Sequence, residues 1–72
     1  MNQYNFFVRI KKEKIGFYSQ FFDAFEHMVA VRTPEPPSGE FGTMHCMVCP
    51  SFFDDFKEVL HNHELEYEYV AS

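Results

Sequence analysis

The hydrophobic and polar residues of this chain alternate in four short stretches, which is the pattern of half-buried β-strands. The stretches are Tyr4–Ile10, Met28–Thr33, Thr43–Cys49 and Glu64–Val70. The first contains aromatic and β-branched residues, the second contains β-branched residues, and the last alternates acids with leucine and tyrosine. Pro50 ends the third stretch, because proline lacks the N–H that a sheet requires. The sequence therefore predicts four strands.

Two other stretches repeat their hydrophobic residues every three or four positions, which predicts amphipathic helices. The first runs from about Lys14 to Glu26, and the second runs from about Phe52 to His61. The apolar face of the first helix is aromatic and consists of Phe17, Tyr18, Phe21, Phe22 and Phe25. We expect Ser51 to cap the N-terminus of the second helix and Asn62 to cap its C-terminus.

The predicted elements follow one another in the order βαββαβ, with the proline-rich segment Pro34–Glu40 as a loop between the second and third strands. Right-handed crossovers then give a ferredoxin-like α+β fold. We expect a four-stranded antiparallel sheet in the order 4-1-3-2, with two helices on one face. A chain of 72 residues has room for one hydrophobic core, so we expect a single domain over residues 1–72. Its ten phenylalanines supply much of that core.

Charge and motif content narrow the classes of function. Six lysines and arginines oppose eleven acids, and the net charge of −5 argues against binding to nucleic acid or to an anionic membrane. No apolar run approaches the roughly 20 residues of a membrane-spanning helix. Because charges interrupt the N-terminal stretch, we expect a cytoplasmic protein. The sequence contains no nucleophile elbow, phosphate loop or zinc-binding helix motif, so we expect no enzymatic activity and no cofactor.

The side of the predicted sheet that faces away from the helices has an apolar middle flanked by charges. Pairing the second and third strands across the proline-rich loop would place Ala30 near His45 and Met28 near Met47. A single copy of the chain would leave this apolar surface in contact with water. We therefore expect a homodimer whose interface consists of Phe7, Met28, Ala30, His45 and Met47.

The segment His45–Cys49 contains two cysteines three positions apart, a spacing that occurs in metal and redox sites. In a strand the two side chains would point to opposite faces, with their Cα atoms about 10 Å apart. A disulfide requires a Cα separation below about 7 Å, so free thiols are the favoured interpretation. The alternative is a zinc or copper site in which Cys46 or Cys49 binds the metal together with His45 or His27.

The hydrophobic pattern also resembles that of a known family. The resemblance lies in Ile15, Phe21-Phe22 and Phe25-Glu26 running into Val29–Thr33, then a proline-containing turn, a strand, and Pro50-Ser51-Phe52 at the start of the last helix. In these features the chain resembles a family of short bacterial proteins known only as a domain of unknown function. The resemblance covers most of the chain and implies a ferredoxin-like layout with no activity attached. In layout alone, the chain is also similar to regulatory domains that sense small ligands and usually dimerise.

These observations predict a non-enzymatic regulatory module that associates with itself through the outer face of its sheet. Arg9 and Arg32, at the margin of that face, are candidates for binding a small-molecule or protein ligand. Two alternatives stay open. One is the zinc or copper protein described above. The other is an acidic inhibitor that binds a basic partner through Glu66, Glu68 and neighbouring acids.

Overall fold

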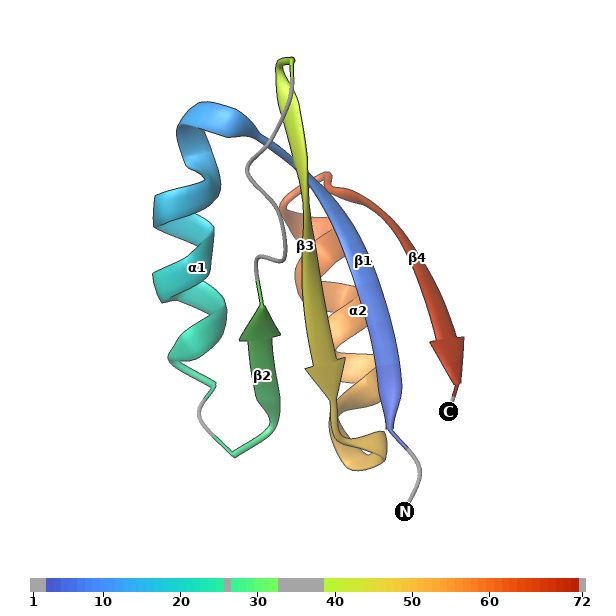
Figure 1. Ribbon diagram of the computed structural model, residues 1–72. Coiled ribbons are helices and arrows are strands. Elements are labelled where there is room, and N and C mark those ends of the chain that lie inside the picture. Colours follow the sequence, from blue (N-terminus) through green and yellow to red (C-terminus); the bar gives the residue numbers. More distant parts are fainter. Residues whose placement is uncertain (1–2, 26, 33–38, 72) are drawn as a thin grey trace.

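The computed structural model of the protein describes residues 3–25, 27–32 and 39–71 (Figure 1). Its elements, in chain order, are β1 (Tyr4–Lys11), α1 (Ile15–Asp23), β2 (Val29–Arg32), β3 (Phe41–Val48), α2 (Phe53–Asn62) and β4 (Glu66–Ala71). A short 3-10 turn leads into each helix, over Lys12–Lys14 and over Pro50–Phe52. The predicted order of strands and helices is confirmed. Most of the predicted loop Pro34–Glu40 lies outside the described residues, as do the predicted ends of two elements at Glu26 and Thr33.

The four strands form one antiparallel sheet in the order β2-β3-β1-β4 (Figure 1). Counted from the other edge, this is the predicted order 4-1-3-2. β1 pairs with β3 along its whole length and with β4 on its other side, so β1 and β3 are the two inner strands. β2 and β4 form the two edges. The protein is thus an α+β fold built on an open antiparallel sheet.

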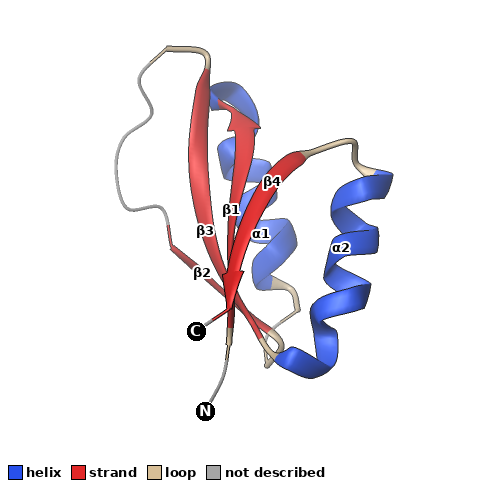
Figure 2. Ribbon diagram, turned by 90° about the vertical axis from the view of Figure 1, so that its right-hand side faces the viewer, coloured by secondary structure: helices blue, strands red, loops and turns tan. Residues whose placement is uncertain are grey.

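One face of the sheet and both helices enclose the hydrophobic core. The strands contribute Phe6, Val8, Ile10, Val29, Met44, Cys46 and Val48, all at alternate positions and all buried. The helices contribute Tyr18 and Phe22 from α1 and Phe56 and Leu60 from α2. The ring centroids of Phe22 and Phe56 lie 5.4 Å apart, so the two helices meet over the same face of the sheet. Figure 2 shows α2 on that side of the sheet.

The start of α2 differs from the sequence-based prediction. Ser51 lies inside the 3-10 turn, and Phe52 takes the N-cap position without a side-chain capping hydrogen bond. The reason is that the 3-10 turn begins at Pro50, one residue before the predicted cap, so Ser51 already lies inside the turn. The backbone N–H of Phe52 donates to the carbonyl of Cys49 at 2.9 Å, which satisfies it without a side-chain cap. The prediction of Ser51 as the N-cap is wrong.

The end of α2 also differs from the prediction, because Asn62 is the last helical residue and not the cap. The chain leaves the helix through Glu64, which has a left-handed φ of 57°. The Glu64 N–H donates to the carbonyl of His61 at 3.0 Å. The Leu65 N–H donates to the carbonyl of Leu60, also at 3.0 Å. These two bonds define a Schellman motif, in which glycine usually holds the left-handed position.

Replacing Glu64 with glycine is expected to raise the free energy of unfolding by about 1 kcal/mol. The gain comes from removing a Cβ that crowds the following carbonyl in the left-handed conformation. Urea unfolding followed by circular dichroism measures it. The matched control is Glu64→Gln, which removes the charge at the helix C-terminus but keeps the Cβ, and should gain only about 0.3 kcal/mol. Equal gains from both variants would mean that charge, and not backbone conformation, limits stability here.

Candidate functional site

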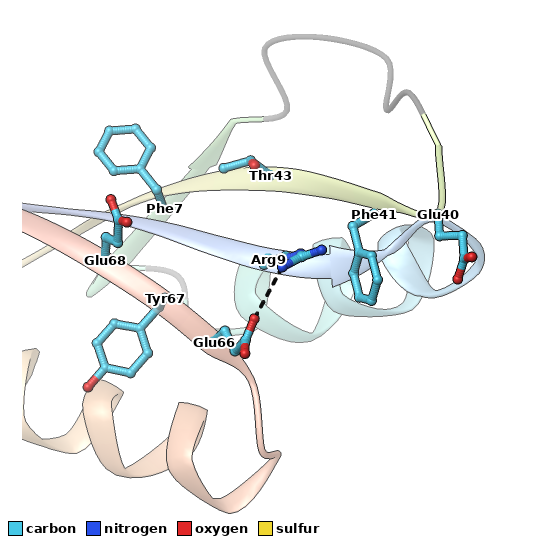
Figure 3. A pocket seen from close by; sticks show the side chains of 8 residues that line it. All are labelled: Phe7, Arg9, Glu40, Phe41, Thr43, Glu66, Tyr67 and Glu68. Atoms are coloured by element: carbon cyan, nitrogen blue, oxygen red, sulfur yellow. Dashed lines mark hydrogen bonds and ion pairs between the residues drawn. The ribbon is translucent and has the colours of Figure 1, made fainter.

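The face of the sheet that points away from the helices carries a mixed set of side chains, and we call it the open face. It consists of Asn5, Phe7, Arg9, Lys11, Ala30, Arg32, Phe41, Thr43, His45, Met47, Glu66, Glu68 and Val70. Successive side chains of a strand point to opposite faces, so these residues alternate with those of the core. Figure 3 shows Phe7 and Glu68 pointing to one side of the sheet, while Tyr67 points to the helix side.

Backbone pairing aligns the open-face side chains in rows that run across the strands. The first row, from the β2 edge to the β4 edge, contains Arg32, His45, Phe7 and Glu68. The second row contains Ala30, Met47, Asn5 and Val70. The third row contains Thr43, Arg9 and Glu66, and a last, shorter row contains Phe41 and Lys11. Each row thus brings together residues that are far apart in the sequence.

The register between β2 and β3 corrects the sequence-based prediction. Ala30 lies opposite Met47, and it is Arg32 that lies opposite His45. The carbonyl of Met28 accepts the N–H of Cys49 at 2.9 Å, so Met28 pairs beyond Met47. The prediction was wrong by two residues. A shift of two keeps every side chain on its face, so the hydrophobic alternation that predicted the strands cannot distinguish the two registers.

His45 is held in place from two sides at the centre of the open face. One of its ring nitrogens, Nε2, is hydrogen-bonded to the side-chain oxygen Oδ1 of Asn5 at 2.8 Å. Its ring also stacks on that of Phe7, with centroids 4.8 Å apart and planes 12° from parallel. His45 and Asn5 are both half-buried. One polar atom of each side chain is therefore already paired, which lowers the cost of covering them.

Arg9 already has two partners within its own chain. Its Nη1 donates to Oε1 of Glu66 at 3.4 Å, and its guanidinium carbon lies 4.2 Å from the centroid of the Phe41 ring. Both partners of this ion pair are exposed, so it contributes only about 0–1 kcal/mol to stability. It nevertheless holds the guanidinium between Glu66 on β4 and the ring of Phe41 on β3.

A shallow hollow surrounds Arg9 at this end of the open face (Figure 3). Its lining consists of Phe7, Arg9, Glu40, Phe41, Thr43, Glu66, Tyr67 and Glu68. Three of these side chains are acids and one is a base, a balance that opposes the binding of an anion. Arg32 is not part of the lining, because it sits in another row on the far side of β3. The anion-binding role of the two arginines stays a prediction, and the structure does not bring them together.

Several large apolar side chains on or next to the open face are exposed to solvent. Phe7 and Val70 expose 38% and 57% of their surface, and Met28, next to β2, exposes 40%. Ala30 and Met47 lie between them in the second row. Asn5 and Val70 also lie on this face but were not among the predicted residues, although Asn5 is two positions from Phe7 and Val70 is two positions from Glu68. Alternation along β1 and β4 was the available signal for them.

The structure separates the residues of the predicted metal site. Cys46 lies in the core, while its neighbour His45 lies on the opposite side of the sheet. Burial raises the pKa of the Cys46 thiol to about 12, which opposes the thiolate that a metal needs. The Sγ of Cys49 donates to the backbone carbonyl of His27 at 3.4 Å, so it is the backbone of His27 that approaches it. Among the described residues, no three His, Cys, Asp or Glu side chains gather in a metal-binding group.

Comparisons of the chain with protein-family models, with curated protein sequences and with solved structures found no match. The resemblance to short bacterial proteins of unknown function therefore stays a prediction. Within the part of the chain that the structure describes, no helix is long and apolar enough to cross a membrane. Function must be argued from the geometry of the open face.

Proposed function

We propose that this chain is a non-enzymatic ferredoxin-like module that associates with a second copy of itself through the open face. The observation that carries the proposal is the exposed apolar surface of Phe7, Met28 and Val70 around a polar pair that is hydrogen-bonded within the chain. Contiguous apolar surface of this kind, rimmed by charges, is typical of protein–protein contacts. The internal bond already satisfies Nε2 of His45 and Oδ1 of Asn5, so a partner that covers this pair has fewer polar groups to match.

The size of the open face predicts a weak association. Four strands about 4.8 Å apart and about six residues long make a face about 19 Å wide and about 20 Å long. A contact of this size lies near or below the lower limit of stable interfaces, which is about 1,200 Å² in total. The dimer should therefore form at micromolar or higher concentrations, and its dissociation constant should respond measurably to single substitutions. This range suits a regulatory module, whose association must be reversible.

Replacing Met47 with glutamate is expected to keep the protein monomeric. Met47 lies on an inner strand, between Ala30 and Asn5, where a second copy would bury the new carboxylate without a partner. Sedimentation equilibrium and native mass spectrometry over a wide range of concentration measure the mass. The matched control is Gln20→Glu, which adds the same charge on exposed α1, on the helix side. Circular dichroism checks that both variants fold.

Two results would contradict the proposal. The first is a wild-type protein that stays monomeric up to the highest concentration that can be reached. The second is a folded Met47→Glu variant that dimerises as tightly as the wild type, which would place the contact elsewhere on the surface. If Gln20→Glu and Met47→Glu weaken the dimer equally, the effect belongs to net charge and not to the open face.

A further inference from the structure

We propose that the two copies are related by a two-fold axis that runs along the strands, so that β2 of each copy covers β4 of its partner. In this arrangement Arg32 forms an ion pair with Glu68 of the partner subunit, on both sides of the axis. The inference rests on the proposed function, since it specifies how the two open faces meet. It is carried by the order of charges in the first row of the open face.

The first row is complementary to itself when it is reversed. From one edge to the other it runs cation, ring, ring, carboxylate, in the residues Arg32, His45, Phe7 and Glu68. The two rings in its middle are stacked on one another, and the two charged side chains at its ends are exposed. A second row of the same kind, laid over it in the opposite direction, would match each charge with its opposite and each ring with a ring.

Rotation about an axis parallel to the strands produces that reversal. The axis would lie midway between the two sheets and over the gap between β1 and β3. Each strand then faces the strand at the mirrored position of the other sheet, so β2 faces β4 and β3 faces β1. Packed sheets lie about 10 Å apart, and the two edges of one row are about 14 Å apart, which leaves two separate ion pairs at the rims. Opposite charges at the rim fix the register of an interface.

The other two-fold axis in the plane of the interface gives the opposite result. An axis perpendicular to the strands would place β4 of one copy over β4 of its partner and β2 over β2. The carboxylates of Glu66 and Glu68 would then face the same pair of acids, and Arg32 would face the edge that carries the other Arg32. Like charges brought together across an interface are destabilising. The pattern of charges on the two edges therefore selects the axis along the strands.

The other rows are compatible with this arrangement. In the second row, Ala30 would face Val70 of the partner subunit, so both members of that contact are apolar. In the third row, Arg9 would lie close to Arg9 of the partner subunit, next to the axis. Each of these two cations is already paired with Glu66 of its own chain, which reduces their mutual repulsion. In the last row, Lys11 would face Phe41 of the partner subunit, so the charges of these two rows do not outweigh the ion pairs of the first row.

Reversing single charges tests the arrangement. Glu68→Arg and Arg32→Glu should each raise the dissociation constant of the dimer about tenfold or more, because each turns two ion pairs into two repulsive contacts. An equal mixture of the two variants should form a mixed dimer far in excess of either homodimer, since all four charges are then matched. Native mass spectrometry resolves the three species, because the variants differ in mass. The double variant Arg32→Glu/Glu68→Arg should dimerise like the wild type.

Matched controls separate this local effect from overall charge. Glu58→Arg changes the net charge as Glu68→Arg does, but on exposed α2, and Lys12→Glu changes it as Arg32→Glu does, in the turn before α1. A mixture of these two controls should show no more than a slight preference for the mixed dimer. All five variants alter exposed side chains, so circular dichroism should report wild-type folding.

The possible outcomes distinguish this inference from the proposed function. A monomeric wild type would remove the open-face dimer altogether. A wild-type dimer that Met47→Glu disrupts, but that both single charge reversals leave unchanged, would keep the open face and overturn the axis along the strands. In that case a mixture of the two variants that binds more tightly than the wild type would indicate the perpendicular axis. Weakening by each single reversal, with recovery in the mixture, supports the inference.

Discussion

Replacing Phe22 with alanine is expected to lower the free energy of unfolding by about 3–5 kcal/mol. The Phe22 side chain is fully buried, and its ring lies 5.4 Å from that of Phe56 and 5.7 Å from that of Tyr18. It therefore joins α1 to α2 over the sheet. Domains are stabilised by about 0.05–0.15 kcal/mol per residue, so a short chain has little stability to lose. We expect a large unfolded fraction without denaturant, measured by circular dichroism and by urea titration.

Phe17 supplies the matched control for this substitution on the same helix. Its side chain is 60% exposed, and its ring contacts only Tyr18 and Phe21 of the same helix among the ring pairs of the described residues. Phe17→Ala removes the same atoms but leaves no internal cavity, because the side chain lies at the surface. It should therefore change the free energy of unfolding by less than about 1 kcal/mol. If both variants lost the same amount, α1 would have to be rotated from the orientation described here.

The sequence predicted which residues face the helices because each predicted element has only one way to bury its apolar side. In β1, alternation places Phe6, Val8 and Ile10 on one face, and all three are buried. In α1, spacings of three and four residues place Tyr18 and Phe22 on the buried side. Burial of apolar surface is the dominant favourable term in folding. The spacing of apolar residues along the chain therefore predicts which side of each element is buried, and with it the architecture.

The sequence could not predict how neighbouring strands align, because hydrophobic alternation repeats every two residues. The register of β2 on β3 was therefore missed by two residues, and with it the pairing of Arg32 with His45. The bond between His45 and Asn5 was missed for the same reason, since it depends on how β1 and β3 are aligned. The capping prediction at Ser51 failed because it considered the side chain and not the turn that Pro50 starts. The residue types identified the candidate side chains, but the pairing of the strands determines which of these side chains lie next to one another.

Arg9 illustrates the same limit at the candidate site. From its place at the margin of the sheet, the sequence predicts that Arg9, like Arg32, is a candidate for binding an anion. The pairing of β1 with β4 places Glu66 directly opposite it, and the two form an ion pair at 3.4 Å. Arg32, in contrast, lies on an edge strand, where pairing places His45 beside it. The two arginines therefore differ in what they can offer a partner, and only the strand register shows this difference.

The two cysteines are expected to differ strongly in reactivity toward alkylating reagents. Burial raises the pKa of the Cys46 thiol from 9.0 to about 12, which lowers its thiolate fraction about a thousandfold below pH 9. Cys49 is only half-buried, at the end of β3. Mass spectrometry after treatment with iodoacetamide should show one adduct on the folded protein and a second only when denaturant is added. Cys49→Ser should abolish the fast adduct, whereas equal rates for both thiols would contradict the burial of Cys46.

The same pKa makes stability depend on pH in the alkaline range. The folded protein keeps the Cys46 thiol protonated up to about pH 12, while in the unfolded chain the thiol ionises near pH 9.0. Between these values the unfolded state binds fewer protons, so the stability that is fully present below pH 9 is lost as the pH rises. The contribution of this one group has a slope of up to about 1.4 kcal/mol per pH unit. Cys46→Ala should start from a lower stability, because it leaves a small cavity, but should decline less steeply than Cys49→Ser. Parallel declines in the two variants would show that the Cys46 thiol ionises as readily in the folded protein as in the unfolded chain.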